Sequence, residues 1–138
     1  MPGVEIRCLC GAVRATLVGE PLVQFYCHCD DCQAVSGGAY VALAMFPLAA
    51  LSVLQGKTAA FTLRSIPRER CGACGTQLFA RLPAQGICVV KADLLPAPMR
   101  KPEFHMQCRY SVLPVKDDLP HYQGVPARFG GSDELAGW

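Results

Sequence analysis

The stretch Cys71-Gly72-Ala73-Cys74-Gly75 decides the fold, because its spacing is typical of a metal-binding turn. In a C-x-x-C-G turn the chain folds back on itself, and the glycine after the second cysteine permits a left-handed backbone. Structural zinc takes four ligands in a tetrahedron, however, and this turn supplies only two. It therefore predicts a second pair of ligands elsewhere in the chain.

Cys8-Leu9-Cys10 provides that pair. Residues i and i+2 of an extended strand lie on the same face, so both thiolates can reach one ion. Cys8, Cys10, Cys71 and Cys74 together predict a structural zinc site, which contributes on the order of 10 kcal/mol to folding. The alternative is a thioredoxin-like redox pair at the turn. That pair would begin a helix in a βαβ unit, and no helical pattern follows Gly75.

A second cluster, Cys27-His28-Cys29-Asp30-Asp31-Cys32, places three thiols in one short segment. Three protein ligands with an open fourth position are typical of catalytic zinc. Cys27, Cys29 and Cys32 are therefore the predicted ligands of a catalytic zinc, which makes two zinc ions per chain. We expect the second ion to be held less tightly, with partial occupancy, because its site has one ligand fewer.

Other interpretations of this cluster stay open. It could be a second closed site, with His28, His105 or Cys108 as the fourth ligand. For His28 itself we expect a surface position or one behind the ligands, pointing away from the thiols. Asp30 and Asp31 are expected to be solvated turn residues.

The chain has nine cysteines, an odd number that fits metal ligation better than a disulfide framework. Its start shows no signal peptide, so a cytoplasmic location is expected, where stable disulfides are rare. Cys88 lies in an apolar stretch and is predicted to be a buried packing thiol. Cys108 is a weaker candidate for a fourth ligand or a redox partner.

Length and composition predict one globular domain over residues 1–138. The net charge is only +2 and no basic block stands out, which argues against nucleic acid and anionic membranes as partners. The longest apolar run, residues 39–54, contains Pro47 and is shorter than the roughly 20 residues of a membrane-spanning helix.

The hydrophobic pattern predicts a mainly β chain of short strands with little helix. A helical turn is expected at 30–36, closed by Gly37-Gly38, and a second helix at 48–54, where Pro47 suits the first turn. From residue 117 onward we expect irregular structure. The predicted strands are two within 4–18 with a turn at Cys10-Gly11, then 23–26, 40–46, 58–64, 76–81, 87–90 and 104–108.

The order of these groups resembles the glutathione-dependent formaldehyde-activating enzymes, whose domain also occurs in centromere protein V. The resemblance covers about residues 3–126, and it implies a domain core at about 3–126 with a C-terminal tail at 127–138. It rests on Cys8-x-Cys10-Gly11, Cys27-His28-Cys29-x-x-Cys32-Gln33, Ser36-Gly37, Gly56, Cys71-x-x-Cys74-Gly75-Thr76, Pro102-x-x-His105 and Asp118-Leu119-Pro120. It implies a β-tent fold of short antiparallel strands stapled by zinc. It also implies a structural zinc on Cys8, Cys10, Cys71 and Cys74 and a catalytic zinc on Cys27, Cys29 and Cys32.

The resemblance further implies a carbon–sulfur lyase that adds formaldehyde, or a related carbonyl, to the thiol of glutathione and forms S-hydroxymethylglutathione. Basic side chains that could meet the carboxylates of glutathione are Arg64, Arg68, Arg70 and Lys91. One alternative is a zinc-stapled module that binds a thiol or a protein without turnover. Another is a redox role for the three-cysteine cluster. The sequence does not indicate an oligomeric state.

Overall fold

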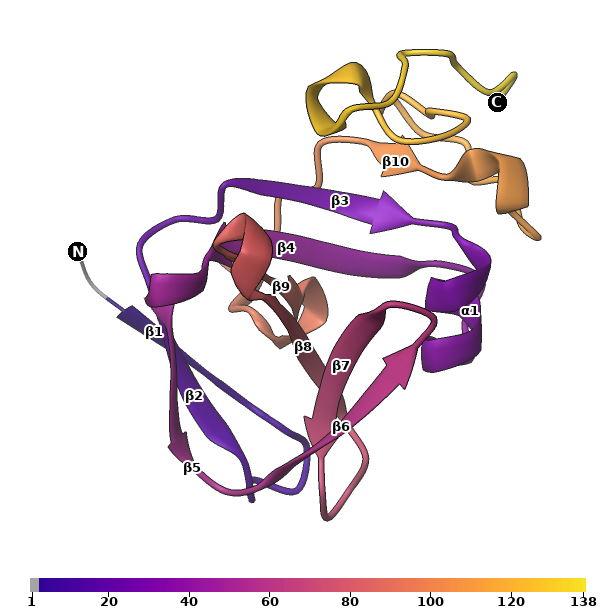
Figure 1. The fold of residues 1–138 in the computed structure, drawn as a ribbon. Coiled ribbons are helices and arrows are strands. Elements are labelled where there is room, and N and C mark those ends of the chain that lie inside the picture. The colour runs from indigo at the N-terminus through magenta and orange to yellow at the C-terminus, as the bar shows by residue number, and fades with distance from the viewer. Residues whose placement is uncertain (1–2) are drawn as a thin grey trace. The chain divides into compact units, whose positions relative to one another are not determined.

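The computed structural model describes residues 3–138, and these residues are mainly β with little helix, as predicted; the one α-helix among them is that expected at 30–36. Figure 1 shows the order of the elements along the chain. The bounds are β1 (Gly3–Arg7), β2 (Arg14–Val18), β3 (Val23–Cys27), α1 (Asp30–Ser36), β4 (Val41–Pro47), β5 (Leu51–Gln55), β6 (Thr58–Leu63), β7 (Ile66–Cys71), β8 (Gln77–Leu82), β9 (Ile87–Lys91) and β10 (His105–Met106). Single turns of 3₁₀ helix occupy Leu48–Ala50, Pro83–Gln85, Ala92–Leu94, Ala97–Met99, Cys108–Tyr110 and Ala127–Phe129.

The described chain forms two compact units, each made of two segments. The first unit runs up to Val23 and continues through Ala44–Arg100, and the second consists of Gln24–Leu43 and Lys101–Trp138. The chain therefore passes from one unit to the other within β3 and again within β4. The single domain with a core at 3–126 stays a prediction.

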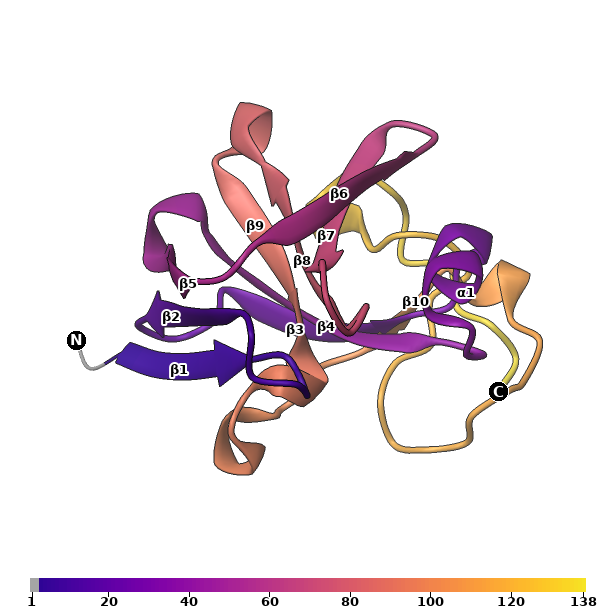
Figure 2. The same cartoon turned by 90° about the horizontal axis from the view of Figure 1, so that it is seen from below.

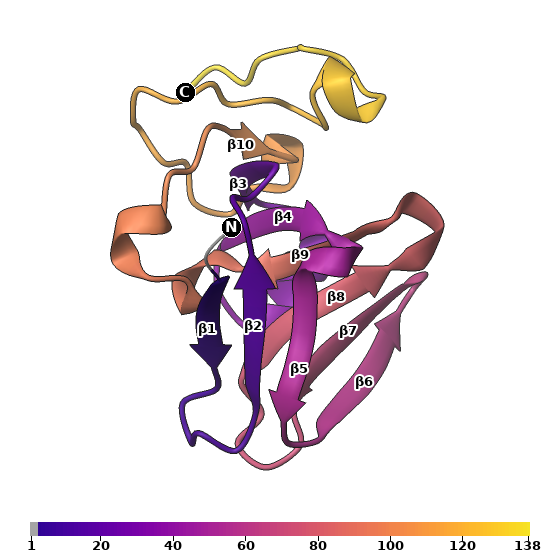
Figure 3. The same ribbon diagram turned by 90° about the vertical axis from the view of Figure 1, so that its left-hand side faces the viewer.

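One sheet of the first unit has the strand order β1-β2-β5, and all its pairs are antiparallel. Figures 2 and 3 show these three strands side by side. The β1–β2 hairpin pairs Gly3 with Val18 and Arg7 with Arg14, so its alternate residues point to one face. Ile6, Ala15 and Leu17 are the buried ones and belong to the core of this unit.

The predicted helix at 48–54 is wrong. A single 3₁₀ turn covers Leu48–Ala50, and the chain then continues as β5. β5 completes an antiparallel ladder along β2, with Leu17 opposite Leu51, and the ladder gives its backbone groups their hydrogen-bond partners. The sequence pattern did not show this partner strand, which is distant in the chain.

Four further strands of the first unit form the antiparallel run β6-β7-β8-β9. Figure 3 shows β6 and β7 as neighbours. β7 was not predicted, because Pro67 interrupts the strand pattern. The proline is tolerated because β8 pairs with β7 only at Glu69 and Arg70, beyond Pro67. The Cys71–Gly75 turn then joins β7 to β8, as expected.

The second unit contains α1, β10 and the irregular segment after it, together with most of β3. Figure 1 shows α1 following directly on β3. The helix ends at Gly37, which has a left-handed backbone with a φ of 76°. β10 pairs with β3 in parallel, His105 opposite Tyr26 and Met106 opposite Cys27. This strand is shorter than the predicted 104–108, because Gln107 is left-handed and a 3₁₀ turn begins at Cys108.

An aromatic core holds the second unit together. The rings of Phe25 and Phe104 stack with their centroids 5.5 Å apart, and Phe129 packs on Phe25 edge-on at 6.0 Å. These contacts fasten the irregular C-terminal segment to β3 without regular pairing. Among residues 3–138, no helix is long and apolar enough to cross a membrane.

Candidate functional site

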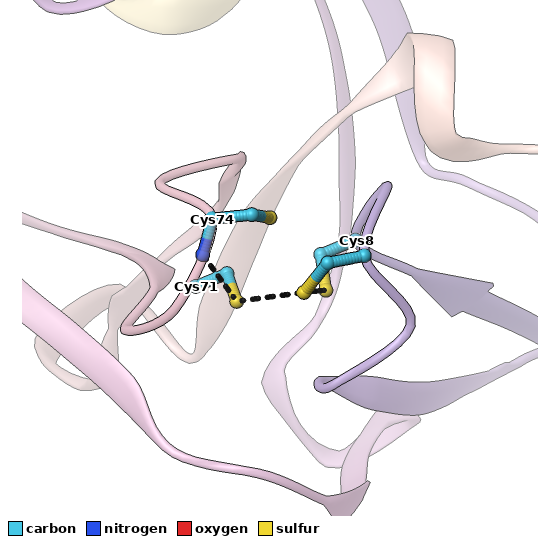
Figure 4. Close-up of side chains that lie close together, drawn as sticks. Cys8, Cys71 and Cys74 are labelled. Atoms are coloured by element: carbon cyan, nitrogen blue, oxygen red, sulfur yellow. Dashed lines mark hydrogen bonds between the residues drawn. The ribbon is translucent and has the colours of Figure 1, made fainter.

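The four predicted ligands of the first cluster lie together in the first unit. The sulfur atoms of Cys8, Cys10, Cys71 and Cys74 are all within 4.8 Å of one another, and all four thiols are free. Cys10 Sγ is 3.5 Å from Cys8 Sγ and 3.8 Å from Cys71 Sγ. Figure 4 shows Cys8 facing Cys71 and Cys74 from the opposite loop. The β1–β2 loop and the β7–β8 turn thus present two sulfurs each.

Backbone N–H groups surround these sulfurs. Val13 donates to Cys8 Sγ at 3.3 Å and Ala12 to Cys10 Sγ at 3.5 Å. In the turn, the N–H groups of Ala73 and Cys74 both donate to Cys71 Sγ at 3.3 Å. Hydrogen bonds from N–H groups favour the thiolate, which is the form that binds metals.

The four thiols of this cluster influence one another's protonation. The Thr76 hydroxyl lies 3.0 Å from Cys74 Sγ, and its hydrogen bond lowers the pKa of Cys74 to about 5. The hydrogen bond from the Ala12 N–H also lowers the pKa of Cys10. The neighbouring thiols of Cys8 and Cys74 act in the opposite direction, and the net result is a pKa of about 12. Four sulfurs this close do not all ionise without a positive ion between them. The donor set and the spacing therefore fit a tetrahedral zinc.

Gly56 supports the same cluster from β5. Its φ is 91°, and a Cβ at this position would lie only 2.1 Å from the carbonyl oxygen of Ala12. Only glycine lets the end of β5 approach this loop so closely. The loop is the one whose N–H groups bond to Cys8 and Cys10.

The three predicted ligands of the second cluster also lie together, in the second unit. The sulfurs of Cys27, Cys29 and Cys32 are within 4.8 Å of one another. Cys27 is the last residue of β3, Cys29 is the N-cap of α1, and Cys32 lies in the first turn of the helix. The N–H of Cys32 donates to Cys29 Sγ at 3.3 Å. A strand end followed at once by a helix start thus brings the three thiols together.

The described residues add no fourth ligand to this cluster: no histidine, cysteine or carboxylate of residues 3–138 joins the three sulfurs. Hydrogen bonds with Cys29 and Cys32 raise the pKa of Cys27 well above its usual range. As in the first cluster, a cation would relieve this crowding of sulfurs. The arrangement fits a metal ion with three protein ligands and one open position.

Of the two positions expected for His28, at the surface or behind the ligands, the surface position is wrong. His28 is fully buried rather than on the surface. Its Nε2 lies 2.9 Å from Nδ1 of His105, and its ring stacks on Tyr40 with centroids 4.9 Å apart. Burial, with a contribution from the nearby His105, lowers the pKa of His28 to about 4, so the imidazole is neutral.

A third group of potential ligands was missed by the sequence analysis. His105, Asp117 and His121, here called the histidine–aspartate cluster, have ligand atoms within 4.8 Å of one another in the second unit. Burial lowers the pKa of His105, so it is neutral. Burial tends to raise the pKa of Asp117, but the hydrogen bonds from His105 and the Leu119 N–H and the nearby imidazoles together outweigh it, so the net shift is downward. The sequence signal was weak, because these residues meet through pairing of distant segments rather than through short spacing.

The other residues singled out in the sequence are two further cysteines and four basic residues. Cys88 is fully buried, as expected for a packing thiol, and lies outside the metal-ligand groups of the described residues. Cys108 is also outside them, and burial raises its pKa to about 11. Lys91 pairs with Asp93 at 3.1 Å, and the Arg70 guanidinium lies over the Phe61 ring at 5.2 Å. Contacts of Arg64, Arg68, Arg70 and Lys91 with a substrate stay a prediction.

Comparison with known proteins identifies relatives. A family model described as glutathione-dependent formaldehyde-activating enzyme matches residues 3–110, which include both cysteine clusters. The crystal structure of a Rhodobacter sphaeroides protein from Northeast Structural Genomics matches with a TM-score of 0.56 and 20% sequence identity. The match covers 68% of this chain and 89% of that one, and it shows a shared fold. No curated protein matches the chain.

Proposed function

The chain belongs to the glutathione-dependent formaldehyde-activating enzyme family, and we propose that it is a zinc-dependent carbon–sulfur lyase. The proposed reaction adds formaldehyde, or a related small carbonyl compound, to the thiol of glutathione and forms S-hydroxymethylglutathione. The observation that carries the proposal is the convergence of Cys27, Cys29 and Cys32 without a fourth ligand among the described residues. In this proposal the four-cysteine cluster holds a structural zinc.

Cys27, Cys29 and Cys32 would hold the zinc ion, which would lower the pKa of a thiol bound beside them. The protein's part is to hold the three sulfurs rigidly. Cys27 is fixed by pairing of β3 with β10, and Cys29 is fixed as the N-cap of α1. Gln33 donates from Nε2 to the carbonyl oxygens of His28 at 2.8 Å and Tyr110 at 2.9 Å, which anchors the helix.

The charge of the site favours delivery of a thiolate over polarisation of the carbonyl. Three thiolates and one divalent ion carry a net charge of −1, and such a site is a weak Lewis acid. The thiol of glutathione gives its proton to water, its sulfur attacks the carbonyl carbon, and a carbon–sulfur bond forms. The electron pair of the C=O double bond moves to oxygen, which takes a proton from water. The reverse reaction follows the same path.

The proposal is tested by exchange NMR of glutathione and ¹³C-formaldehyde at equilibrium. We expect the zinc-loaded protein to accelerate exchange between free formaldehyde and S-hydroxymethylglutathione. The acceleration by the Cys32→Ser variant should be at least about tenfold smaller. Cys88→Ala is the matched control, because it removes a buried thiol outside the clusters. Glutathione binding without acceleration by the wild type would instead support a binding module without turnover.

A further inference from the structure

The histidine–aspartate cluster lies outside the proposed reaction, yet its geometry is that of a ligand set. His105 Nε2 is 2.8 Å from Asp117 Oδ2, and His121 Nε2 is 3.1 Å from Asp117 Oδ1. Both imidazoles are buried, at 0% and 5% exposure, while the aspartate side chain is 32% exposed. One carboxylate thus lies between two imidazole nitrogens, with a path to solvent.

The backbone holds these side chains from both sides. The N–H of His105 donates to the Pro120 carbonyl at 2.9 Å, and the N–H of Tyr122 donates to the His105 carbonyl at 2.9 Å. His121 is therefore clamped opposite His105, in a parallel bridge. Asp117 is fixed separately, since its Oδ1 accepts from the N–H of Leu119 at 3.0 Å. The arrangement is built by backbone pairing and does not depend on flexible surface side chains.

A hydrogen bond and ring packing also fix the orientation of the two histidine rings. His28 Nε2 bonds to Nδ1 of His105 and leaves Nε2 of His105 directed at Asp117. Histidines that bind metals are held through their second ring nitrogen in this manner. The Tyr26 ring stacks on His105 with centroids 4.7 Å apart, and the Trp138 ring packs on His121 at 4.6 Å. These rings keep water from the imidazoles and strengthen electrostatic interactions beside them.

The surroundings of His121 Nε2 favour a bound ion. This nitrogen is buried and, despite its closeness to Asp117, makes no hydrogen bond. A buried polar atom without a partner destabilises the folded chain, and a metal ion would give this nitrogen a partner. Tetrahedral zinc, with N and O ligands at about 2.0–2.1 Å, would separate the ligand atoms by roughly 3.3 Å. The observed nitrogen–oxygen distances, 2.8 Å from His105 to Oδ2 and 3.1 Å from His121 to Oδ1 of Asp117, are a few tenths of an ångström shorter than this. The ligand atoms of all three residues lie within 4.8 Å of one another, which leaves room for one ion between them.

We propose that His105, Asp117 and His121 bind a divalent first-row transition-metal ion, most suitably zinc, which fastens residues 117–122 to β10. Two imidazoles and one carboxylate suit zinc and its neighbours in the series. Magnesium and calcium prefer all-oxygen sites. The ion would stabilise a segment with little regular structure, and it would be separate from the ions of both cysteine clusters.

The test uses the full chain with its cysteine clusters filled first with cadmium, which prefers thiolates. Cobalt(II) is then titrated. We expect the wild type to take up one cobalt per chain with a visible d–d absorption and no sulfur-to-cobalt charge transfer, together with a rise in melting temperature. Asp117→Asn and His121→Gln should each weaken cobalt binding by about a hundredfold or more.

Asp118→Asn is the matched control, because it makes the same chemical change at the neighbouring exposed residue, outside the cluster. It should bind cobalt as the wild type does. The cadmium–thiolate absorption of each sample reports whether the cysteine clusters have folded. Absence of cobalt uptake by the wild type would overturn the proposal and leave a hydrogen-bonded cluster. Wild-type-like uptake by Asp117→Asn, or equal losses in Asp117→Asn and Asp118→Asn, would also overturn it.

Discussion

Gly56 shows how a residue without a side chain can affect the four-cysteine cluster through the backbone of a neighbouring loop. A Cβ there would collide with the Ala12 carbonyl oxygen, within the loop that donates N–H bonds to Cys8 and Cys10. We expect Gly56→Ala to lower the free energy of unfolding by about 3 kcal/mol or more and to weaken zinc binding at the four-cysteine cluster. Chemical unfolding and a zinc-competition titration measure the two effects.

Gly86→Ala is the control for this prediction. Gly86 also has a positive φ, 68°, but a Cβ there would have no heavy atom within 4 Å. The Gly86→Ala substitution should lower the free energy of unfolding only by the backbone strain, about 1–2 kcal/mol, and leave zinc affinity unchanged. Equal effects of the two substitutions would show that the close approach to Ala12 is unimportant.

His28 gives a prediction about pH. Its pKa falls from 6.5 to about 4 on folding, so the unfolded chain binds the proton more readily. Stability from the neutral imidazole is therefore complete above pH 6.5 and is lost as the pH falls toward 4, by at most about 1.4 kcal/mol per pH unit. In urea unfolding at pH 7 and pH 5, the wild type should lose more stability than His28→Asn. If His28→Asn loses as much stability between pH 7 and pH 5 as the wild type, or more, this account is contradicted.

The residues of the two cysteine clusters were predictable because each pair or triplet is close in sequence. A C-x-x-C-G turn and a C-x-C strand carry their geometry with them. His105, Asp117 and His121 were not assembled by the same reasoning. Their meeting depends on a parallel bridge between His105 and His121 and on a turn at Asp117, which local spacing does not encode.

At the scale of elements, the short helix α1 depends on one glutamine. Gln33 donates from its amide to two carbonyl oxygens, those of His28 and Tyr110. Gln33→Glu replaces the donor by a carboxylate oxygen that faces both carbonyls. We expect a loss of about 2 kcal/mol or more in the free energy of unfolding, measured in urea at pH 7. Gln85→Glu is the control, because it makes the same change at an exposed glutamine. Similar urea midpoints for the Gln33→Glu and Gln85→Glu variants would argue against anchoring by Gln33.

Most strands were predicted where apolar residues alternate or run together, as in β1, β2, β4 and β6. The errors fell where tertiary pairing decides between conformations. β5 follows Pro47 and a 3₁₀ turn, a pattern that also suits a helix, and only its ladder with β2 makes it a strand. β7 keeps Pro67 because the proline lies beyond the rungs shared with β8.

At the scale of the whole molecule, each compact unit holds one cysteine cluster, and each unit is assembled from two segments of the chain. The sequence could not show this division. The chain crosses between the units within β3 and β4, so no linker marks the first two boundaries. In the first unit, the four-cysteine cluster joins the β1–β2 loop to the β7–β8 turn. Small units with limited cores gain much of their stability from such sites.

The central claim is that Cys27, Cys29 and Cys32 hold a metal ion whose open position takes the thiol of glutathione. The direct measurement is ¹¹³Cd NMR of the cadmium-loaded protein during a glutathione titration, because the cadmium chemical shift reports the number of sulfur ligands. We expect two sulfur-rich signals. The signal that disappears in Cys32→Ser should move toward the four-sulfur position as glutathione binds, while the signal that disappears in Cys74→Ser stays fixed. A glutathione titration that leaves both signals unmoved would contradict the account.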